Sequence, residues 1–147
     1  MLHVMTYVAP SSIHGLGVFT AAPVAKGTLI WTFEEYFDRR YDEAQFQALH
    51  PVIHEYFKVY GYRDKHDGFY YMTVDNDRFT NHSETPNTCV DSLGNCYALK
   101  DIACNEELTA DYREFYMDLE QLGPFMSNEL NNEMMSKINT EVNYAAS

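Results

Sequence analysis

The sequence predicts a mainly β fold with a short helical insert, a β-rich variant of the α+β class. Short runs of β-branched and aromatic residues, separated by clusters of turn residues, make up most of the chain. Apolar residues at helical spacing are concentrated in one region, residues 42–60. With 147 residues, 46% of them hydrophobic, the chain has the length of one domain and enough apolar side chains for a core.

Three strands are expected before the insert, over residues 2–8, 17–21 and 28–33. The segments Pro10-Ser11-Ser12 and Ala25-Lys26-Gly27 separate them. Both segments contain residues that favour turns.

The insert is expected to hold two short helices. Asp42 and Gln45 have the spacing of a capping box, which starts a helix. Pro51 occupies a favoured first helical position and starts the second helix. An apolar stripe at helical spacing follows, formed by Ile53, Tyr56, Phe57 and Tyr60.

After the insert the sequence returns to strand-like runs at residues 69–74, 88–91, 96–102 and 108–112. Residues 75–87 between the first two runs are irregular and polar, and loops of this polarity often carry function.

The spacing of apolar residues after residue 113 predicts one more short helix, which Gly123-Pro124 ends. The segment beyond it is rich in Asn, Glu and Met. We therefore expect one domain over residues 1–122 and a C-terminal tail over residues 123–147 that is either weakly helical or disordered.

Charge narrows the choice of partners. The 22 acidic and 10 basic side chains give a formal charge of −12, which repels phosphate backbones and anionic lipids and attracts basic protein segments. We therefore expect no direct nucleic-acid partner and no membrane partner. The alternative is that the charge serves only solubility.

Cysteine and histidine patterns suggest neither disulfides nor a metal. Cys89, Cys96 and Cys104 lack C-x-x-C spacing, which favours a reducing intracellular compartment. His50 and His54 are four residues apart but have no evident third ligand. The N-terminal residues do not resemble a signal peptide, and no apolar stretch is long enough to span a bilayer. We expect a soluble cytoplasmic protein without a metal.

Three separated segments carry a family resemblance. They read His-Gly-Leu-Gly-Val-Phe at residues 14–19, Arg-Phe-Thr-Asn-His-Ser-Glu-Thr-Pro-Asn at residues 78–87, and Glu-Glu-Leu-Thr-Ala-Asp-Tyr at residues 106–112. In this order they resemble the opening Gly-x-Gly segment, the Asn-His motif and the closing motif of SET-domain protein-lysine methyltransferases. The resemblance covers the chain from about Val4 to Tyr112.

The resemblance implies a fold of small curved sheets in which the closing segment threads beneath a preceding loop, a C-terminal pseudoknot. It also implies transfer of a methyl group from S-adenosylmethionine to a lysine amine of a protein or peptide with a basic segment. The cysteine-rich zinc segments of many eukaryotic members are absent from this sequence. The chain therefore looks like a minimal member, of the bacterial or viral type.

The resemblance also implies a set of cofactor-binding residues. The first motif would offer its main chain to the methionine part of the cofactor, and the Asn-His pair would hold its adenosine and amino-acid ends. The implied residues are His14, Gly15, Leu16, Gly17, Arg78, Asn81, His82 and Tyr112. From the residues alone, the Gly-x-Gly segment is also compatible with a simple turn that binds no ligand. Asn81 and His82 are likewise compatible with a purely structural role in bracing a loop. Arg78 would either brace that loop or lie near the cofactor carboxylate.

Tyr112 is the expected catalytic residue, because the last tyrosine of the family's closing motif points its hydroxyl at the site of methyl transfer. A lysine amine, with an ordinary pKa of about 10.4, must lose a proton before its lone pair can attack. A narrow apolar channel lowers that pKa and aligns the reacting atoms, while a tyrosine hydroxyl steadies the methyl group through weak C–H···O contacts. The alternative is a half-buried core tyrosine, one of 12 in the chain.

Other aromatic residues are candidates for the channel and its cap. Tyr62, Tyr70 and Tyr71 would form the channel wall or belong to the sheet core, and Phe115 and Tyr116 would cap the site. Val90 and Ala110 occupy places where the family often has Phe or Tyr, an aromatic that limits how many methyl groups are added. The number of methyl groups therefore stays open.

Two further functions are compatible with these motifs. One is a catalytically silent SET-fold module that uses the same acidic surface to bind basic peptides, because a fold does not determine a function. The other is methylation of a small amine or of a non-histone protein.

Overall fold

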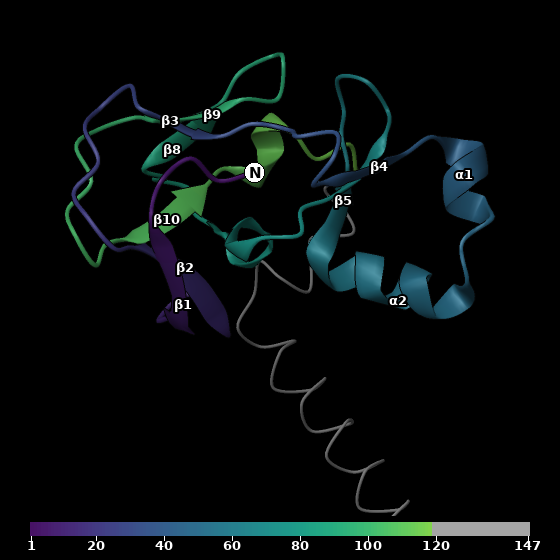
Figure 1. The fold of residues 1–147 in the computed structure, drawn as a ribbon, viewed down its shortest axis with the longest axis horizontal. Coiled ribbons are helices and arrows are strands. Elements are labelled where there is room, and N and C mark those ends of the chain that lie inside the picture. Colours follow the sequence, from purple (N-terminus) through teal and green to yellow (C-terminus); the bar gives the residue numbers. More distant parts are fainter. Residues whose placement is uncertain (119–147) are drawn as a thin grey trace, which may run out of the picture. The chain divides into compact units, whose positions relative to one another are not determined.

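The computed structural model describes residues 1–118, which build three small β-sheets (Figure 1). The first sheet has four strands in the order β1 (Thr6–Pro10), β2 (Leu16–Thr20), β10 (Glu107–Ala110) and β7 (Asn81–His82). Strands β1 and β2 form an antiparallel pair, β10 is antiparallel to β2, and β10 runs parallel to β7.

The second sheet has the order β3 (Leu29–Trp31), β9 (Cys96–Ala98) and β8 (Thr88–Val90), with antiparallel neighbours throughout. Strands β8 and β9 are joined by a turn in which Gly94 has a φ of 81°. Glycine adopts this left-handed conformation without steric strain, so it suits this position.

The third sheet carries the helical insert. Its antiparallel strands are β4 (Arg39–Tyr41), β6 (Tyr70–Met72) and β5 (Gly61–Arg63), in that order. Helices α1 (Glu43–Gln47) and α2 (Pro51–Tyr60) connect β4 to β5 and lie beside this sheet in Figure 1. Two 3₁₀ helices, η1 (Asn76–Phe79) and η2 (Tyr112–Glu114), follow β6 and β10 in the chain.

The hydrophobic core joins the first two sheets. Val18 of β2 and Leu108 of β10 are at most 1% exposed, and Ile30 and Trp31 of β3 pack in the same cluster. Burying a large apolar side chain of this kind typically stabilises a fold by about 1.5–3 kcal/mol. The two sheets therefore hold each other, and β10 lies at their junction.

Strand β10 is hydrogen-bonded on both edges by one neighbouring segment, residues 81–88. The Ala110 carbonyl accepts from Ser83 N–H at 3.0 Å, next to the parallel pairing with β7. Thr109 instead bonds Asn87 and Thr88: its N–H donates to Asn87 Oδ1 at 2.9 Å and its carbonyl accepts from the Thr88 hydroxyl at 2.8 Å. Successive residues of a strand direct these groups to opposite edges. Residues 81–88 therefore pass around β10, as the predicted threading requires.

The predicted mainly β fold with a short helical insert is confirmed. The capping box is present, because Asp42 accepts from Gln45 N–H at 2.8 Å and Gln45 accepts from Asp42 N–H at 2.9 Å. The second helix starts at Pro51 as expected, with His50 as its N-cap. The predicted helix after residue 113 does not form over residues 115–118, where Tyr116 makes an isolated bridge with Asp64; the rest of it and the tail over 123–147 lie outside the described residues.

The expected bounds of the first strand were wrong. The first strand covers Thr6–Pro10 instead of residues 2–8, because its partner is β2 while Leu2 forms only an isolated bridge with Trp31. Residues of the apolar stripe of α2 differ in burial: Phe57 is 5% exposed, whereas Tyr56 is 41% exposed. Phe57 reaches the third sheet, where it packs on Tyr41 and Tyr70.

Among residues 1–118, no helix combines the length and apolar character needed to cross a membrane. The same residues contain no cluster of three or more His, Cys, Asp or Glu side chains that could hold a metal ion.

Asn87→Ala should lower the free energy of unfolding by about 1–3 kcal/mol, because the buried Thr109 N–H loses its acceptor. Chemical denaturation measures this change. Ser92→Ala, in an exposed turn, is the matched control and should stay close to wild type. Equal stability of both variants would show that β10 does not depend on this bond.

Candidate active site

The hydroxyl and the backbone N–H of Tyr112 are both hydrogen-bonded to residues that follow η1. Its hydroxyl donates to the Thr80 carbonyl at 2.5 Å, and its backbone N–H donates to His82 Nδ1 at 3.2 Å. Burial raises the pKa of Tyr112 well above its ordinary value. The hydroxyl therefore stays protonated at neutral pH, with oxygen lone pairs left to accept weak contacts.

An aromatic cluster lies beside Tyr112. Tyr116 stacks on it at 4.9 Å between ring centroids, and Phe115 meets it edge-on at 5.7 Å. Tyr62 of β5 packs on both of these residues, 5.0 Å from Phe115 and 5.4 Å from Tyr116. The predicted capping role of Phe115 and Tyr116 therefore fits their positions over the Tyr112 ring.

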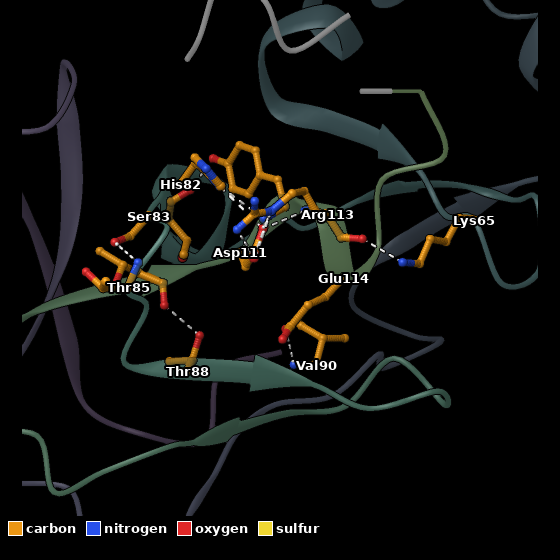
Figure 2. Close-up of polar contacts among 12 residues, drawn as sticks. Lys65, His82, Ser83, Thr85, Thr88, Val90, Asp111, Arg113 and Glu114 are labelled. Atoms are coloured by element: carbon orange, nitrogen blue, oxygen red, sulfur yellow. Dashed lines mark hydrogen bonds and ion pairs between the residues drawn. The ribbon is translucent and has the colours of Figure 1, made fainter. Parts of the chain in front are cut away.

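The segment that follows Tyr112 is anchored on two sides. Glu114 Oε2 accepts from Val90 N–H at 2.7 Å, and Lys65 Nζ donates to the Arg113 carbonyl at 2.6 Å (Figure 2). Backbone bonds add to this, because Lys65 N–H donates to the Phe115 carbonyl at 2.8 Å. The aromatic cap is thus held against the end of β8 and the turn after β5.

A cavity of about 80 Å³ opens beside the Tyr112 ring. Pockets for drug-sized ligands are usually about 300–1,000 Å³, so this volume suits one slender side chain and not a nucleoside. Its walls include the aromatic cluster, and Thr80, Val90 and Ala110. Val90 and Ala110 are small residues, which leaves the cavity without an aromatic at either place.

Several buried polar atoms in the cavity walls lack a partner among the described residues. They are Trp31 Nε1, Thr73 Oγ1 and Arg78 Nε. Unpaired buried polar atoms are rare because each costs free energy, and they are expected where a ligand or an ordered water completes the site. The cavity therefore combines aromatic walls with a few polar atoms that a ligand can pair with.

Asp77 also lines this cavity. It lies in η1, where its Oδ1 accepts from the Thr80 hydroxyl at 3.3 Å. Burial, with the nearby charge of Asp75, raises the pKa of Asp77 to about 7. A carboxyl group with a pKa this close to neutrality is uncommon outside functional sites.

The buried side chain of Asn81 braces the first motif. Its Nδ2 lies 3.1 Å from the His14 carbonyl, 3.0 Å from the Leu16 carbonyl and 2.8 Å from Glu107 Oε1. Glu107 also accepts from the Ser11 hydroxyl at 2.8 Å. The side chain of Asn81 therefore fixes the backbone of residues 14–16, and its own main chain pairs with β10.

The two motif glycines differ in what surrounds them. Gly15 has a φ of 46°, and a side chain there would meet nothing within 4 Å. A Cβ at Gly17 would lie 2.2 Å from Glu107 Oε1 and 3.1 Å from Ser11 Cβ. Gly15 therefore leaves open space for a ligand, whereas the space above Gly17 is filled by the Glu107 carboxylate.

His82 combines a bonded and an unbonded ring nitrogen. Nδ1 accepts from Tyr112 N–H and lies 3.9 Å from Asp111 Oδ1, and Arg113 holds that carboxylate (Figure 2). The bonds from Arg113 lower the pKa of Asp111. Nε2 is buried and has no partner among residues 1–118. One polar atom of the Asn-His motif is thus left for a ligand.

The structure brings the predicted site residues together in two connected groups. Arg78 and Tyr112 line the cavity, while the backbone of His14, Leu16 and Gly17 is gathered around Asn81 and Glu107. Residues 80–82 connect the groups through their bonds to Tyr112. The assignment of cofactor contacts stays a prediction.

Of the candidates for the channel wall, only Tyr62 belongs to the Tyr112 cavity. Tyr71 stacks on Tyr62 at 5.5 Å and lines a neighbouring cavity. Tyr70 instead fits the alternative of a sheet residue outside the channel, because it stacks on Phe46 at 3.8 Å and its hydroxyl donates to Glu43 on α1. The alternation of side chains along β6 places Tyr70 and Tyr71 on opposite faces.

Reasoning from sequence missed Asp77, Thr80 and Glu107 as residues that shape the site. Asp77 sits in a polar run, Asp75-Asn76-Asp77, which looks like a solvated loop. The signal that could have singled it out is its position between the strand over 69–74 and the Asn-His motif.

Asp77→Asn should change how stability depends on pH. Because the folded-state pKa of about 7 exceeds the value of about 3.9 for an unfolded chain, the folded state binds the proton more tightly. The unfolding free energy of the wild type should therefore fall as pH rises through this window, and the loss is complete above it. The Asn variant should lack this decline.

Denaturation of both proteins at a series of pH values from about 4 to about 8 measures this difference. Asp101→Asn, at an exposed position, should keep the wild-type slope. Parallel curves for wild type and Asp77→Asn would contradict the burial of a carboxylate at this site.

Comparison with known proteins places this geometry in a family. A model of the SET domain matches residues 15–113. A Plasmodium falciparum protein assigned as a histone methyltransferase has a similar structure, with a TM-score of 0.53 and 20% identity over 76% of this chain and 95% of that chain. A search of curated proteins gives no significant match.

A second similar structure is a humanized mutant of the Chaetomium thermophilum Polycomb Repressive Complex 2, bound to an inhibitor. It has a TM-score of 0.57 and 16% identity, and the match covers 80% of this chain but only 16% of that chain. At these identities the two structures show a shared fold. Because the family model covers more than half of the sequence, this chain belongs to the SET-domain family.

Proposed function

We propose that this protein transfers a methyl group from S-adenosylmethionine to the side-chain amine of a lysine in a protein. The observation that carries the proposal is the fixed Tyr112 hydroxyl at a narrow, aromatic-walled cavity within a SET domain. The cavity has room for one slender chain, as a lysine side chain is.

The residues of the Asn-His group fit the cofactor. Gly15 leaves its side open, and the buried Nε2 of His82 lacks a protein partner. His14, Leu16, Gly17 and Asn81 would hold the cofactor through main-chain groups, with Arg78 and Tyr112 on the side of the cavity. When bound, S-adenosylmethionine supplies a methyl group activated by its sulfonium charge.

The chain's own residues would prepare the amine. The rings of Tyr62, Phe115 and Tyr116 line the cavity and would shield a bound amine from water, and burial of this kind disfavours the ammonium form and lowers the lysine pKa. The Tyr112 hydroxyl donates to the Thr80 carbonyl, so its oxygen faces the site with a fixed orientation. That oxygen can accept weak C–H···O contacts from the migrating methyl group.

A basic protein segment is the substrate class that the charge favours. A second cavity of about 260 Å³ shares Trp31, Tyr62 and Gly94 with the first one. Asp64 and Asp67 line it, in a chain with a net charge of −12. Basic side chains that flank the target lysine would be attracted to this wall.

The second candidate is a silent module that binds basic peptides in the same place. The intact Tyr112–Thr80 bond and the unpaired polar atoms around the cavity favour the enzyme, since a peptide binder needs neither. Methylation of a small amine is a third candidate, which the narrow cavity also admits. We further propose an intracellular location, which the free state of Cys89, Cys96 and Cys104 supports.

The test combines two measurements on the full chain. Calorimetry should detect binding of S-adenosylmethionine, and mass spectrometry of a lysate treated with methyl-labelled cofactor should find label on protein lysines. Binding of basic peptides without any cofactor binding would favour the silent module. Label confined to small molecules would favour the small-amine alternative.

His82→Ala should weaken cofactor binding, because its Nε2 is free for a ligand, and should also lower stability, because the Tyr112 N–H loses its acceptor. Asn81→Ala should weaken binding and also destabilise the fold by about 1–3 kcal/mol, since two carbonyls and a carboxylate lose their donor. Calorimetry and thermal melting on the same preparations measure both effects. Unchanged affinity in both variants would remove these residues from the cofactor site.

The association rate with a basic substrate peptide should fall steeply as salt rises, because exposed charges are screened beyond about 8 Å at physiological ionic strength. Stopped-flow fluorescence measures this rate. A peptide of the same length with neutral residues around its lysine is the control and should show a weak salt dependence. Equal slopes for the two peptides would show that charge does not steer the substrate.

A further inference from the structure

Asp77 is a carboxylate that the proposed chemistry has not used, although it lies in the wall of the Tyr112 cavity. The Thr80 hydroxyl donates to Asp77 Oδ1 at 3.3 Å, and the Thr80 carbonyl accepts from the Tyr112 hydroxyl at 2.5 Å. One residue therefore orients both groups, and Asp77 shares the narrow space in which Tyr112 would meet an amine.

The surroundings of Asp77 leave its carboxylate available to pair with a cation of the substrate. Its own turn supplies no cation within hydrogen-bonding distance: the Asp77 N–H donates to Asp75, and among the described residues no ion pair involves Asp77. The charged or titratable groups that act on it or line the same cavity are Asp75, Asp38, the N-terminal ammonium, Arg78, Tyr60, Tyr62, Tyr112, Tyr116 and Cys96.

We propose that Asp77 binds the ammonium of the substrate lysine and takes up the proton that this amine loses before methyl transfer. The role rests on the lysine methyltransferase activity proposed above. It makes Asp77 a proton acceptor in the reaction, in addition to the positioning that Tyr112 provides.

The step balances without another reactant. The ammonium gives one proton to the Asp77 carboxylate, which becomes a carboxylic acid, and the amine keeps its lone pair. That pair forms the nitrogen–carbon bond to the methyl group while the carbon–sulfur bond breaks and its electron pair stays on sulfur. The positive charge thereby passes from the sulfonium to the methylated ammonium, and Asp77 returns its proton to water once the product leaves.

The other titratable groups of the cavity are poor acceptors at neutral pH. Burial raises the pKa of the Tyr62, Tyr112 and Tyr116 hydroxyls above the ordinary value and that of the Cys96 thiol to about 12. These groups keep their protons. Asp77, with a pKa of about 7, exchanges its proton in the range where an acceptor works best.

The decisive experiment is the pH dependence of single-turnover methyl transfer to the best peptide from a panel of single-lysine basic peptides. Wild type should show a rate that rises through about pH 7 as Asp77 ionises and then levels off. Asp77→Asn should be slower by on the order of 100-fold at neutral pH. Its rate should keep rising with hydroxide, because bulk base must then remove the proton.

A second variant changes the pKa of the proton acceptor and leaves its carboxyl group in place. Thr80→Val deletes the hydroxyl that lowers the pKa of Asp77, while the Thr80 carbonyl still holds Tyr112. Its rate curve should therefore shift to higher pH, with the plateau rate preserved. Asp101→Asn, exposed and away from the cavity, should reproduce the wild-type curve.

Binding to the cofactor-free protein gives a readout apart from activity. The chosen peptide should bind wild type more tightly than its norleucine analogue, which lacks the amine, and Asp77→Asn should abolish that preference. A wild-type pH curve and an intact preference in a folded Asp77→Asn protein would overturn the role of Asp77 alone. A wild type that methylates no lysine in the panel would overturn the proposed function and this role with it.

Discussion

The site depends on one constraint: residues 81–88 hold β10 from both of its edges. The bonds of Asn87 and Thr88 to Thr109, and of Ser83 to Ala110, fix where the strand ends. Tyr112 follows the end of β10 by two residues. The short connection therefore places its ring beside the residues that precede β7. The hydroxyl then meets the Thr80 carbonyl, and the downstream aromatic residues close over it. The geometry of the candidate site is thus a consequence of strand pairing between distant segments.

The elements that the sequence predicted well are those determined by residues close together in the chain. The capping box at Asp42 and the proline start at Pro51 act within one helical turn, and both are present. The three motifs also indicated the family, which the match over residues 15–113 bears out. Exposure of Tyr56 could not be predicted in the same way, because it depends on how far the third sheet extends beneath α2.

The rest of the site depends on contacts between residues far apart in the chain. Gly17 looks like a residue kept bare for a ligand, yet the structure fills its space with the carboxylate of Glu107, 90 positions later. Asp77 looks like part of a solvated loop, yet it lies in a cavity with Tyr62 and Tyr112. No pattern in the neighbouring sequence predicts either fact. The burial of a polar residue depends on which strands, distant in the sequence, pack around it. The unpaired atoms around the cavity fit a general pattern in which functional sites break the rules of stable packing.

The most direct test of this account compares wild type with Tyr112→Phe in single-turnover methyl transfer, with a melting curve on the same preparation. The substitution keeps the ring and removes only the hydroxyl that bonds Thr80. We predict a loss of turnover of roughly a hundred- to a thousand-fold, the usual effect of losing one preorganised polar contact at a reacting centre, with cofactor affinity and most of the stability retained. Wild-type transfer rates in a well-folded Tyr112→Phe protein would contradict the account, because Tyr112 would then be a structural residue.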